Sequence, residues 1–180
     1  MKSLISGRVI RLPFNDVSTD VIAPTHFKST TSEDRELSAL RPHAMGAIRP
    51  GLDDVVRPGD IFVCGRNFAL GSHRESAVRI FKVWQVQAVV AESAARIWFR
   101  NSIASGLPVF QLKDALSLFD EGDQMEIDTQ NWRISNATRN ETFPINKFPP
   151  TVMEILDAGG IMNMLKSKVD AEGENKGAAA

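Results

Sequence analysis

The chain has 180 residues, of which 43% are hydrophobic and 24% are charged, a composition that suits one domain with a sizeable core. Its formal net charge of -1 gives no overall basic field. This argues against nucleic acid and anionic membranes as partners and leaves any acidic ligand to a local cationic cluster. The single cysteine, Cys64, excludes an internal disulfide and cannot by itself hold a structural zinc or an iron–sulfur cluster.

A strand, a loop, a helix and a long connection are predicted in the first third of the chain. Residues 6–12 alternate in polarity as a strand does, and a proline ends that strand. The polar residues 15–23 follow as a loop, and a helix start signal precedes a predicted helix over residues 31–40. Residues 41–60 are rich in proline and glycine, so we expect a long, mostly irregular connection there.

Strands and helices alternate in the middle of the chain. Their patterns of apolar residues predict a strand over 60–64, a helix over 75–84, a strand over 87–91, a helix over 94–105 and a strand at 109–110. This succession is typical of βαβ units, which form parallel sheets with right-handed crossovers. Cys64 ends the first of these strands, where we expect it to be a small buried hydrophobe.

In the last third of the chain, short strands and polar turns replace the alternation of strands and helices. Three short strands separated by polar turns form a predicted β-meander, at 124–128, 132–135 and 141–143. A closing helix is predicted over 151–158, with two glycines at its carboxyl end. We expect one α/β domain over residues 1–165 and a disordered tail over 166–180, where charged residues are followed by glycine and alanine.

Residues 65–79, with the sequence GRNFALGSHRESAVR, are the best candidate for a functional site. A glycine-rich turn there joins a buried strand to an amphipathic helix, which directs free backbone N–H groups and the positive end of the helix dipole at Ser72. Arg74 adds a planar, permanently charged group that binds carboxylates through two parallel hydrogen bonds. The segment therefore predicts a site for a small carboxylate.

A structural interpretation of the same residues stands beside this one. Ser72 and Glu75 have the spacing of a capping box, in which each side chain accepts from the backbone N–H of the other residue. The two interpretations are compatible, because a cap would also hold the serine in one place.

Five motifs in this order resemble those of the small subunits of 3-isopropylmalate dehydratase, in the aconitase superfamily. They are Ser18-Thr19-Asp20-Val21-Ile22 with Pro24, Arg57-Pro58-Gly59-Asp60, Gly71-Ser72-His73-Arg74-Glu75, Ala94-Ala95-Arg96-Ile97 with Phe99-Arg100-Asn101, and Gly106-Leu107-Pro108-Val109. The resemblance runs from about Ile5 to Leu165. It implies the aconitase-like swivelling domain, an α/β fold of three layers, β/β/α, with a mainly parallel sheet and a small β-meander.

The resemblance also implies a hydro-lyase subunit that is active only with a separate large subunit. That partner would carry a [4Fe–4S] cluster, and this chain would bind no cofactor or metal itself. The implied reaction is dehydration and rehydration of a hydroxy-dicarboxylic acid, namely the 3-isopropylmalate/2-isopropylmalate isomerisation of leucine biosynthesis. Homoaconitate or a methylated malate as substrate, and a catalytically silent carboxylate-binding module, are the alternatives.

The family's functional residues map onto matching positions of this chain. Ser72 matches the serine that acts as base, Arg74 the arginine that binds a substrate carboxylate, and Asp20 the aspartate that orients the site. The alkoxide form of such a serine needs stabilisation by oriented N–H groups and nearby positive charge. Further substrate-binding positions are Thr19, Phe27, Lys28, Gly71 and His73.

Two departures from the family pattern stand out. The family usually has Gly-Cys where this chain has Ala69-Leu70, and Ser where it has His73. His73 either supplies charge to a substrate carboxylate or faces solvent, and both interpretations stay open. The departures favour the silent module as an alternative. A nucleotide-binding loop is disfavoured because the glycine spacing fits no dinucleotide fingerprint.

Two expectations concern the surroundings of the protein. No run of about 18 apolar residues occurs, and the amino terminus lacks the apolar core of a signal peptide, so we expect a soluble, cytoplasmic protein. The apolar Ile48 and Leu52, in the irregular connection, suggest a surface that the partner covers.

Overall fold

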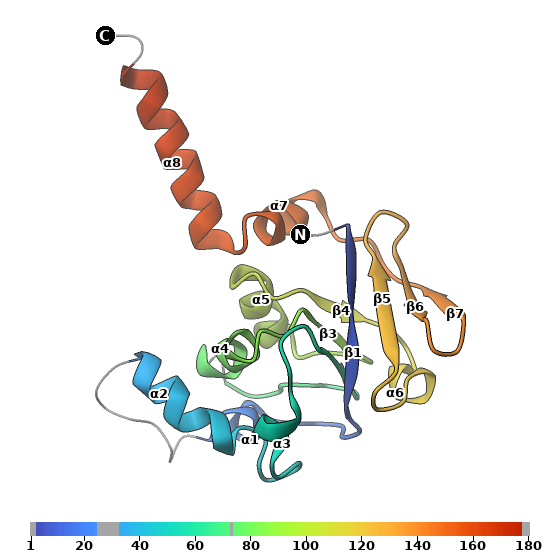
Figure 1. Cartoon of the computed structure of the whole chain (residues 1–180). Coiled ribbons are helices and arrows are strands. Elements are labelled where there is room, and N and C mark those ends of the chain that lie inside the picture. The colour runs from blue at the N-terminus through green and yellow to red at the C-terminus, as the bar shows by residue number, and fades with distance from the viewer. Residues whose placement is uncertain (1–2, 25–32, 73, 178–180) are drawn as a thin grey trace.

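The computed structural model describes residues 3–24, 33–72 and 74–177 of the chain. One seven-stranded sheet, in the order β4-β3-β2-β1-β5-β6-β7, forms its centre (Figure 1). The strands are β1 (Leu4–Leu12), β2 (Ile61–Cys64), β3 (Ala88–Ala91), β4 (Val109–Gln111), β5 (Gln124–Asp128), β6 (Arg133–Asn136) and β7 (Glu141–Pro144). The predicted strands and their order along the chain are confirmed.

Strand β1 joins a parallel half of the sheet to an antiparallel half. Its residues 9–12 pair in parallel with β2, and its residues 4–8 pair in antiparallel fashion with β5. The pairs β2–β3 and β3–β4 are parallel, whereas β5, β6 and β7 form the predicted antiparallel meander. The structure is therefore the α/β fold that the sequence predicts.

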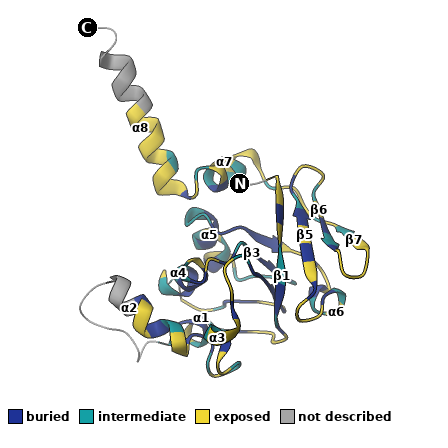
Figure 2. Ribbon diagram, viewed as in Figure 1, coloured by how far each residue is buried: buried dark blue, intermediate teal, exposed yellow. Residues whose placement is uncertain are grey.

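Strands β2 and β3, in the middle of the parallel half, are buried on both faces. Successive side chains of a strand point to opposite faces. Phe62 and Cys64 of β2 accordingly lie in one apolar cluster with the helices, and Ile61 and Val63 lie in a second cluster with the meander. Figure 2 shows these central strands in the colour of buried residues. One face of β2 is thus covered by helices and the other by the meander and α6, which explains why this strand is a continuous apolar run.

The helices are α1 (Thr19–Ile22), α2 (Glu33–Leu40), α3 (Leu52–Val55), α4 (Ser76–Val83), α5 (Arg96–Ala104), α6 (Ala115–Leu118), α7 (Pro150–Asp157) and α8 (Ile161–Gly177), with a 3-10 turn, η2, at Arg41–His43. Helix α4 buries the apolar face that the sequence predicts, including Ala77, Ile80 and Phe81. The ring of Phe81 lies 5.2 Å from that of Phe62 on β2 and 5.6 Å from that of Trp98 on α5. These aromatic contacts fix the position of α4, and with it the preceding loop.

Gln85 ends α4 in the left-handed backbone conformation, with φ of 55°. Its N–H donates to Lys82 O, and the next N–H donates to Phe81 O, the pattern of a helix end that favours glycine. The Gln85 side chain is exposed, so Gln85→Gly removes backbone strain without opening a cavity. We expect a gain of about 1 kcal/mol in the free energy of unfolding and a rise of about 2–4 °C in Tm, measured by thermal denaturation. Gln85→Ala is the control, and an equal gain in that variant would contradict the explanation.

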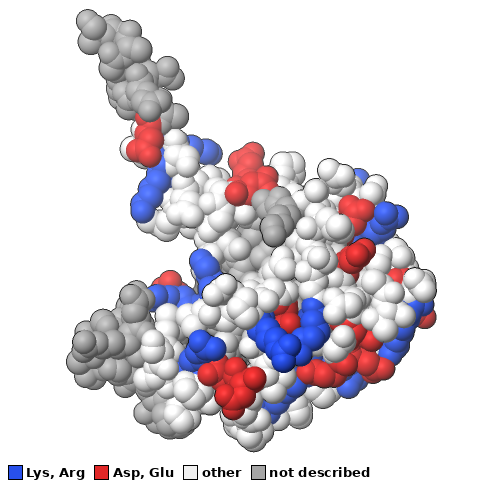
Figure 3. Space-filling model, in the orientation of Figure 1, with Lys and Arg blue, Asp and Glu red and all other residues white. Residues whose placement is uncertain are grey.

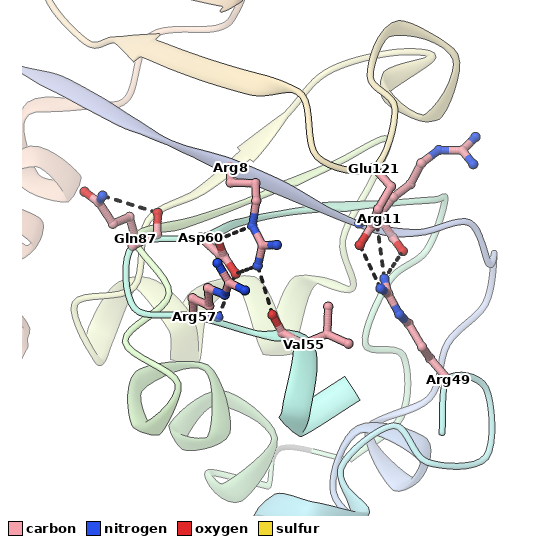
Figure 4. A network of polar contacts seen from close by, with 9 residues as sticks. Arg8, Arg11, Arg49, Val55, Arg57, Asp60, Gln87 and Glu121 are labelled. Atoms are coloured by element: carbon pink, nitrogen blue, oxygen red, sulfur yellow. Dashed lines mark hydrogen bonds and ion pairs between the residues drawn. The ribbon is translucent and has the colours of Figure 1, made fainter. Parts of the chain in front are cut away.

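Two ion-pair networks hold β1 against the connection over residues 41–60 (Figure 4). The Arg8 guanidinium donates to both carboxylate oxygens of Asp60, at 3.1 and 2.8 Å, and to Val55 O at 2.9 Å. The hydrogen bond to Asp60 raises the pKa of Arg8. Arg49 donates to the Glu121 carboxylate at 2.7 Å and to the backbone carbonyl oxygen of Arg11, on β1, at 2.8 Å. The connection is therefore anchored along the sheet.

This anchoring corrects one expectation about the connection. Leu52 is 1% exposed within the chain itself, and Ile48 packs, partly buried, against the same core. Trp84 Nε1 donates to Asp53 at 2.6 Å, which ties α3 to the end of α4. The prediction that a partner covers Leu52 is wrong, because its own helix α3 already turns that side chain inward.

Helix α8 contains most of the segment for which the composition predicts disorder. Over residues 166–177 the structure has a helix instead, and Figure 1 shows α8 extending away from the sheet. Lysine, alanine and glutamate have favourable helix propensities, which accounts for the difference. Met162 and Val169 on α8 are 63% and 67% exposed. No helix of the described residues is long and apolar enough to span a membrane.

Cys64, at the end of β2, is fully buried, and burial raises the pKa of its thiol well above its ordinary value. Because the thiolate is the reactive form, we expect iodoacetamide at about pH 8 to leave Cys64 unmodified in the folded chain. Mass spectrometry after the same treatment in denaturant should show complete alkylation. Equal rates in the folded and denatured chain would contradict the burial.

Candidate active site

Two loops meet where β1 and β2 end. Because these strands are parallel neighbours, the segments that follow them leave the same edge of the sheet. The backbone N–H of Arg66 donates to Asn15 Oδ1 at 2.8 Å, and the N–H of Asp16 donates to Arg66 O at 2.9 Å. Asn67 Nδ2 also donates to Asp16 Oδ1 at 2.9 Å. These contacts join the loop after β1 to the loop after β2.

The same two loops run side by side until they reach the predicted site. Ser18 and Leu70 form a parallel bridge. The N–H of Leu70 donates to Val17 O at 3.0 Å, and the N–H of Thr19 donates to Leu70 O at 2.8 Å. The residues after this bridge, Thr19 at the start of α1 and Gly71 in the second loop, therefore lie next to each other.

Thr19 and Ser72 make direct contact, although they are 53 positions apart. The Ser72 N–H donates to Thr19 Oγ1 at 3.2 Å, and the two hydroxyl oxygens are 3.3 Å apart. Thr19 is fully buried, whereas Ser72 is exposed. Gly71 has φ of 108°, and a Cβ there would lie 3.3 Å from Thr19 Oγ1, so the turn that presents Ser72 suits glycine.

Arg74 and Asp20 form an ion pair beside this contact. The Asp20 side chain on α1 is 64% exposed, and the Arg74 side chain, which precedes α4, is 27% exposed. Arg74 Nη1 is buried, and within the described residues the carboxylate of Asp20 in this ion pair is the partner of that nitrogen. The structure thus brings Thr19, Asp20, Ser72 and Arg74 together in one place.

The predicted capping box does not form. Helix α4 begins at Ser76, with Glu75 at the cap position and no side-chain cap hydrogen bond. The Ser72 N–H is bonded to Thr19 instead, and the positive φ of Gly71 takes the chain out of the helical path before Ser72. The cap therefore does not explain Ser72. The helix begins one residue after its predicted start at residue 75.

Ala69, at a position where the family usually has glycine, has a backbone conformation that is typical of glycine. Ala69 is 1% exposed and has φ of 62°, a conformation that glycine adopts freely and that costs other residues about 1–2 kcal/mol. The loop therefore keeps a glycine-type path where the family usually has glycine. This weakens the argument that the substitution disrupts the site.

The structure does not test every predicted position. Phe27, Lys28 and His73 lie outside the described residues. Arg96 and Arg100, whose roles the motifs leave open, are exposed on α5. The contact between Thr19 and Ser72 is what sequence reasoning missed. The signal for it is the position of each residue just after one of two neighbouring parallel strands.

The middle of the chain is similar to the carboxyl-terminal domain of aconitase. The family model described as the aconitase C-terminal domain matches residues 54–115. The 3-isopropylmalate dehydratase small subunit of Moorella thermoacetica is 41% identical over 155 residues, covering 86% of this chain and 91% of the relative. The chain belongs to the family of 3-isopropylmalate dehydratase small subunits, which confirms the resemblance drawn from its motifs.

Relatives with other names and one solved structure complete the comparison. The isopropylmalate/citramalate isomerase small subunit of Methanocaldococcus jannaschii is 39% identical, covering 94% of this chain and 98% of the relative. The methanogen homoaconitase small subunit of Methanothermobacter thermautotrophicus is 40% identical, covering 94% and 95%. A crystal structure of 3-isopropylmalate dehydratase from Methanocaldococcus jannaschii matches with a TM-score of 0.85 at 34% identity, covering 96% of this chain and 99% of that one.

Proposed function

We propose that this chain is the small subunit of a heteromeric hydro-lyase that interconverts 3-isopropylmalate and 2-isopropylmalate, a step of leucine biosynthesis. The observation that carries the proposal is the arrangement of Ser72, Arg74 and Asp20 at the meeting point of two loops. A hydroxyl, a guanidinium and a carboxylate there suit a hydroxy-dicarboxylic acid. The names of the relatives support the same substrate class.

The roles follow from the chemistry of dehydration. One carbon loses a proton, the electron pair of that C–H bond becomes the new double bond, and the C–O bond of the neighbouring carbon breaks, so that the released proton and hydroxide amount to one water. The exposed Ser72 Oγ is the group that takes the carbon-bound proton, as a positioned general base does. Arg74 binds a substrate carboxylate, and Asp20 holds the guanidinium in place through their ion pair. Rehydration on the other carbon reverses these steps.

The iron–sulfur cluster of such an enzyme does not fit the residues of this chain. Its only cysteine is fully buried in the strand β2, and the described residues contain no group of three or more His, Cys, Asp and Glu side chains that could hold a metal ion. The proposal therefore assigns the [4Fe–4S] cluster to the large subunit. There it would act as Lewis acid for the substrate hydroxyl.

The remaining proposals concern substrate contacts and surroundings. Gly71 would approach the substrate through its backbone, and Phe27, Lys28 and His73 complete the proposed set of contacts. Figure 3 shows basic and acidic side chains interspersed on one face of the molecule, which suits a protein partner and a small diacid better than nucleic acid or a membrane surface. We place the complex in the cytoplasm.

Reconstitution tests the proposal. This chain is mixed with the cluster-bearing large subunit of a 3-isopropylmalate dehydratase, and the absorbance of the unsaturated diacid is followed. The substrates are 3-isopropylmalate, citramalate and homoaconitate, since the relatives carry names of all three types. We expect turnover only with both subunits and the highest kcat/KM for 3-isopropylmalate. Binding of these acids without turnover of any would favour the silent module instead.

A further inference from the structure

Thr19 is a buried hydroxyl whose contacts converge on Ser72. Its side chain is fully buried, at the start of the four-residue helix α1. Its Oγ1 accepts from the Ser72 N–H at 3.2 Å and lies 3.3 Å from Ser72 Oγ. A buried hydroxyl needs hydrogen-bond partners, and both of these partners belong to the residue proposed as the base.

The number of hydrogens on the two hydroxyls gives this contact a direction. A threonine hydroxyl has one hydrogen to donate and two lone pairs that accept. Accepting from the Ser72 N–H uses a lone pair, so the Thr19 hydrogen is free to be donated to Ser72 Oγ. When Ser72 has lost its proton, only Thr19 can be the donor. A hydrogen bond to an ionised oxygen is shorter and stronger than one between neutral groups, so the contact favours the alkoxide over the hydroxyl.

The Thr19 hydroxyl is also held in place by its own backbone. The Thr19 N–H donates to Leu70 O at 2.8 Å, and Thr19 O accepts from the Ala23 N–H at 2.9 Å. Ile22, in the same turn of helix, is fully buried in the core. A donor fixed in this way needs no reorganisation when charge develops on the neighbouring oxygen, which is the condition for effective electrostatic stabilisation.

We infer that Thr19 is a positioning residue, whose hydroxyl fixes Ser72 and donates a hydrogen bond to Ser72 Oγ when the serine gives up its proton. This role differs from the substrate contact that the motifs predict for Thr19, because the side chain is buried behind Ser72. The inference rests on the proposed function, in which Ser72 is the base.

Thr19→Val and Thr19→Ser test the inference in the complex with the large subunit. Valine keeps the shape and removes the hydroxyl, whereas serine keeps the hydroxyl and removes a methyl group. We expect Thr19→Val to lower kcat by about 10- to 100-fold with KM changed by less than about threefold. The rise of kcat with pH should move to higher pH in this variant, because the alkoxide is less stabilised. Thr19→Ser should restore kcat to within about threefold of the parent.

A matched control and a double variant separate this role from a structural one. Thr129 is also buried, and its hydroxyl donates to Ser3 O at 3.2 Å. This threonine follows β5, in the meander half of the sheet, and is distant from Thr19 and Ser72 in the sequence. Thr129→Val should therefore leave kcat unchanged. In a Ser72→Ala background, Thr19→Val should cause no further loss, because Thr19 acts through Ser72.

The outcomes distinguish failure of the inference from failure of the proposed function. Parent-like kcat in Thr19→Val, or equal losses in Thr19→Val and Thr19→Ser, would overturn the inference. A further loss in the double variant would overturn it too, since Thr19 would then act by another route. If Ser72→Ala retains activity, the proposed base is wrong, whereas an inactive Ser72→Ala beside an active Thr19→Val defeats only the role of Thr19.

Discussion

We expect Ser72→Ala to lower kcat of the reconstituted complex by about 100- to 10,000-fold while KM stays near that of the parent. The variant removes the oxygen proposed to take the proton, and it leaves Arg74, the proposed carboxylate-binding residue, paired with Asp20 as before. Ser72 is exposed, and its own backbone N–H keeps its bond to Thr19, so the fold should be unaffected. Steady-state kinetics and thermal denaturation of the same preparation measure both effects.

Ser76→Ala is the matched control for this prediction. Ser76 is the first residue of α4, four positions beyond Ser72, and it belongs to none of the contacts that join the two loops. Its replacement should leave kcat and KM within about threefold of the parent. Activity of Ser72→Ala within the same range would show that another group removes the proton.

The apolar patterns predict the fold well because short stretches of sequence show which strands and helix faces are buried. The residues of β2, Ile61 to Cys64, form an uninterrupted apolar run and are all buried. Helix α4 shows its apolar residues at helical spacing and packs them against β2 and α5. Each of these signals lies within about a dozen residues, so reading them needs no knowledge of distant parts of the chain.

The site is predicted less completely because its decisive contact is not local. Spacing alone identifies Ser72 and Arg74, and the family motifs add Thr19 and Asp20. The local pattern also favours a capping box, which fails because the hydroxyl of Thr19, 53 positions away, takes the Ser72 N–H. The prediction that a partner covers Leu52 fails for the same reason, since a segment rich in proline and glycine gives no local sign that it folds back onto the core.

Gly65→Ala should disturb both the stability and the activity of the protein. Gly65 follows β2 where the two site loops come into contact. A Cβ there would lie 2.5 Å from Phe14 O and 2.5 Å from Asn15 Oδ1. The first of these atoms is backbone and cannot rotate away, so one loop has to move. We expect a loss of about 1–3 kcal/mol in the free energy of unfolding and, because Thr19 and Ser72 belong to the displaced loops, a fall in kcat of the complex of about 100-fold.

Gly122→Ala separates the steric effect from the general cost of replacing a glycine. Gly122 has φ of 89° and no atom within 4 Å of its missing Cβ, so alanine costs about 1–2 kcal/mol of backbone strain there and pushes nothing aside. That variant should lose stability and keep its kcat, whereas Gly65→Ala should lose both. Parent-like kinetics of Gly65→Ala in the folded complex would mean that the contact between the two loops does not set the position of Ser72. The alignment of the base would then have to come from the large subunit, since within this chain the contacts between the loops bring α1 and Ser72 together.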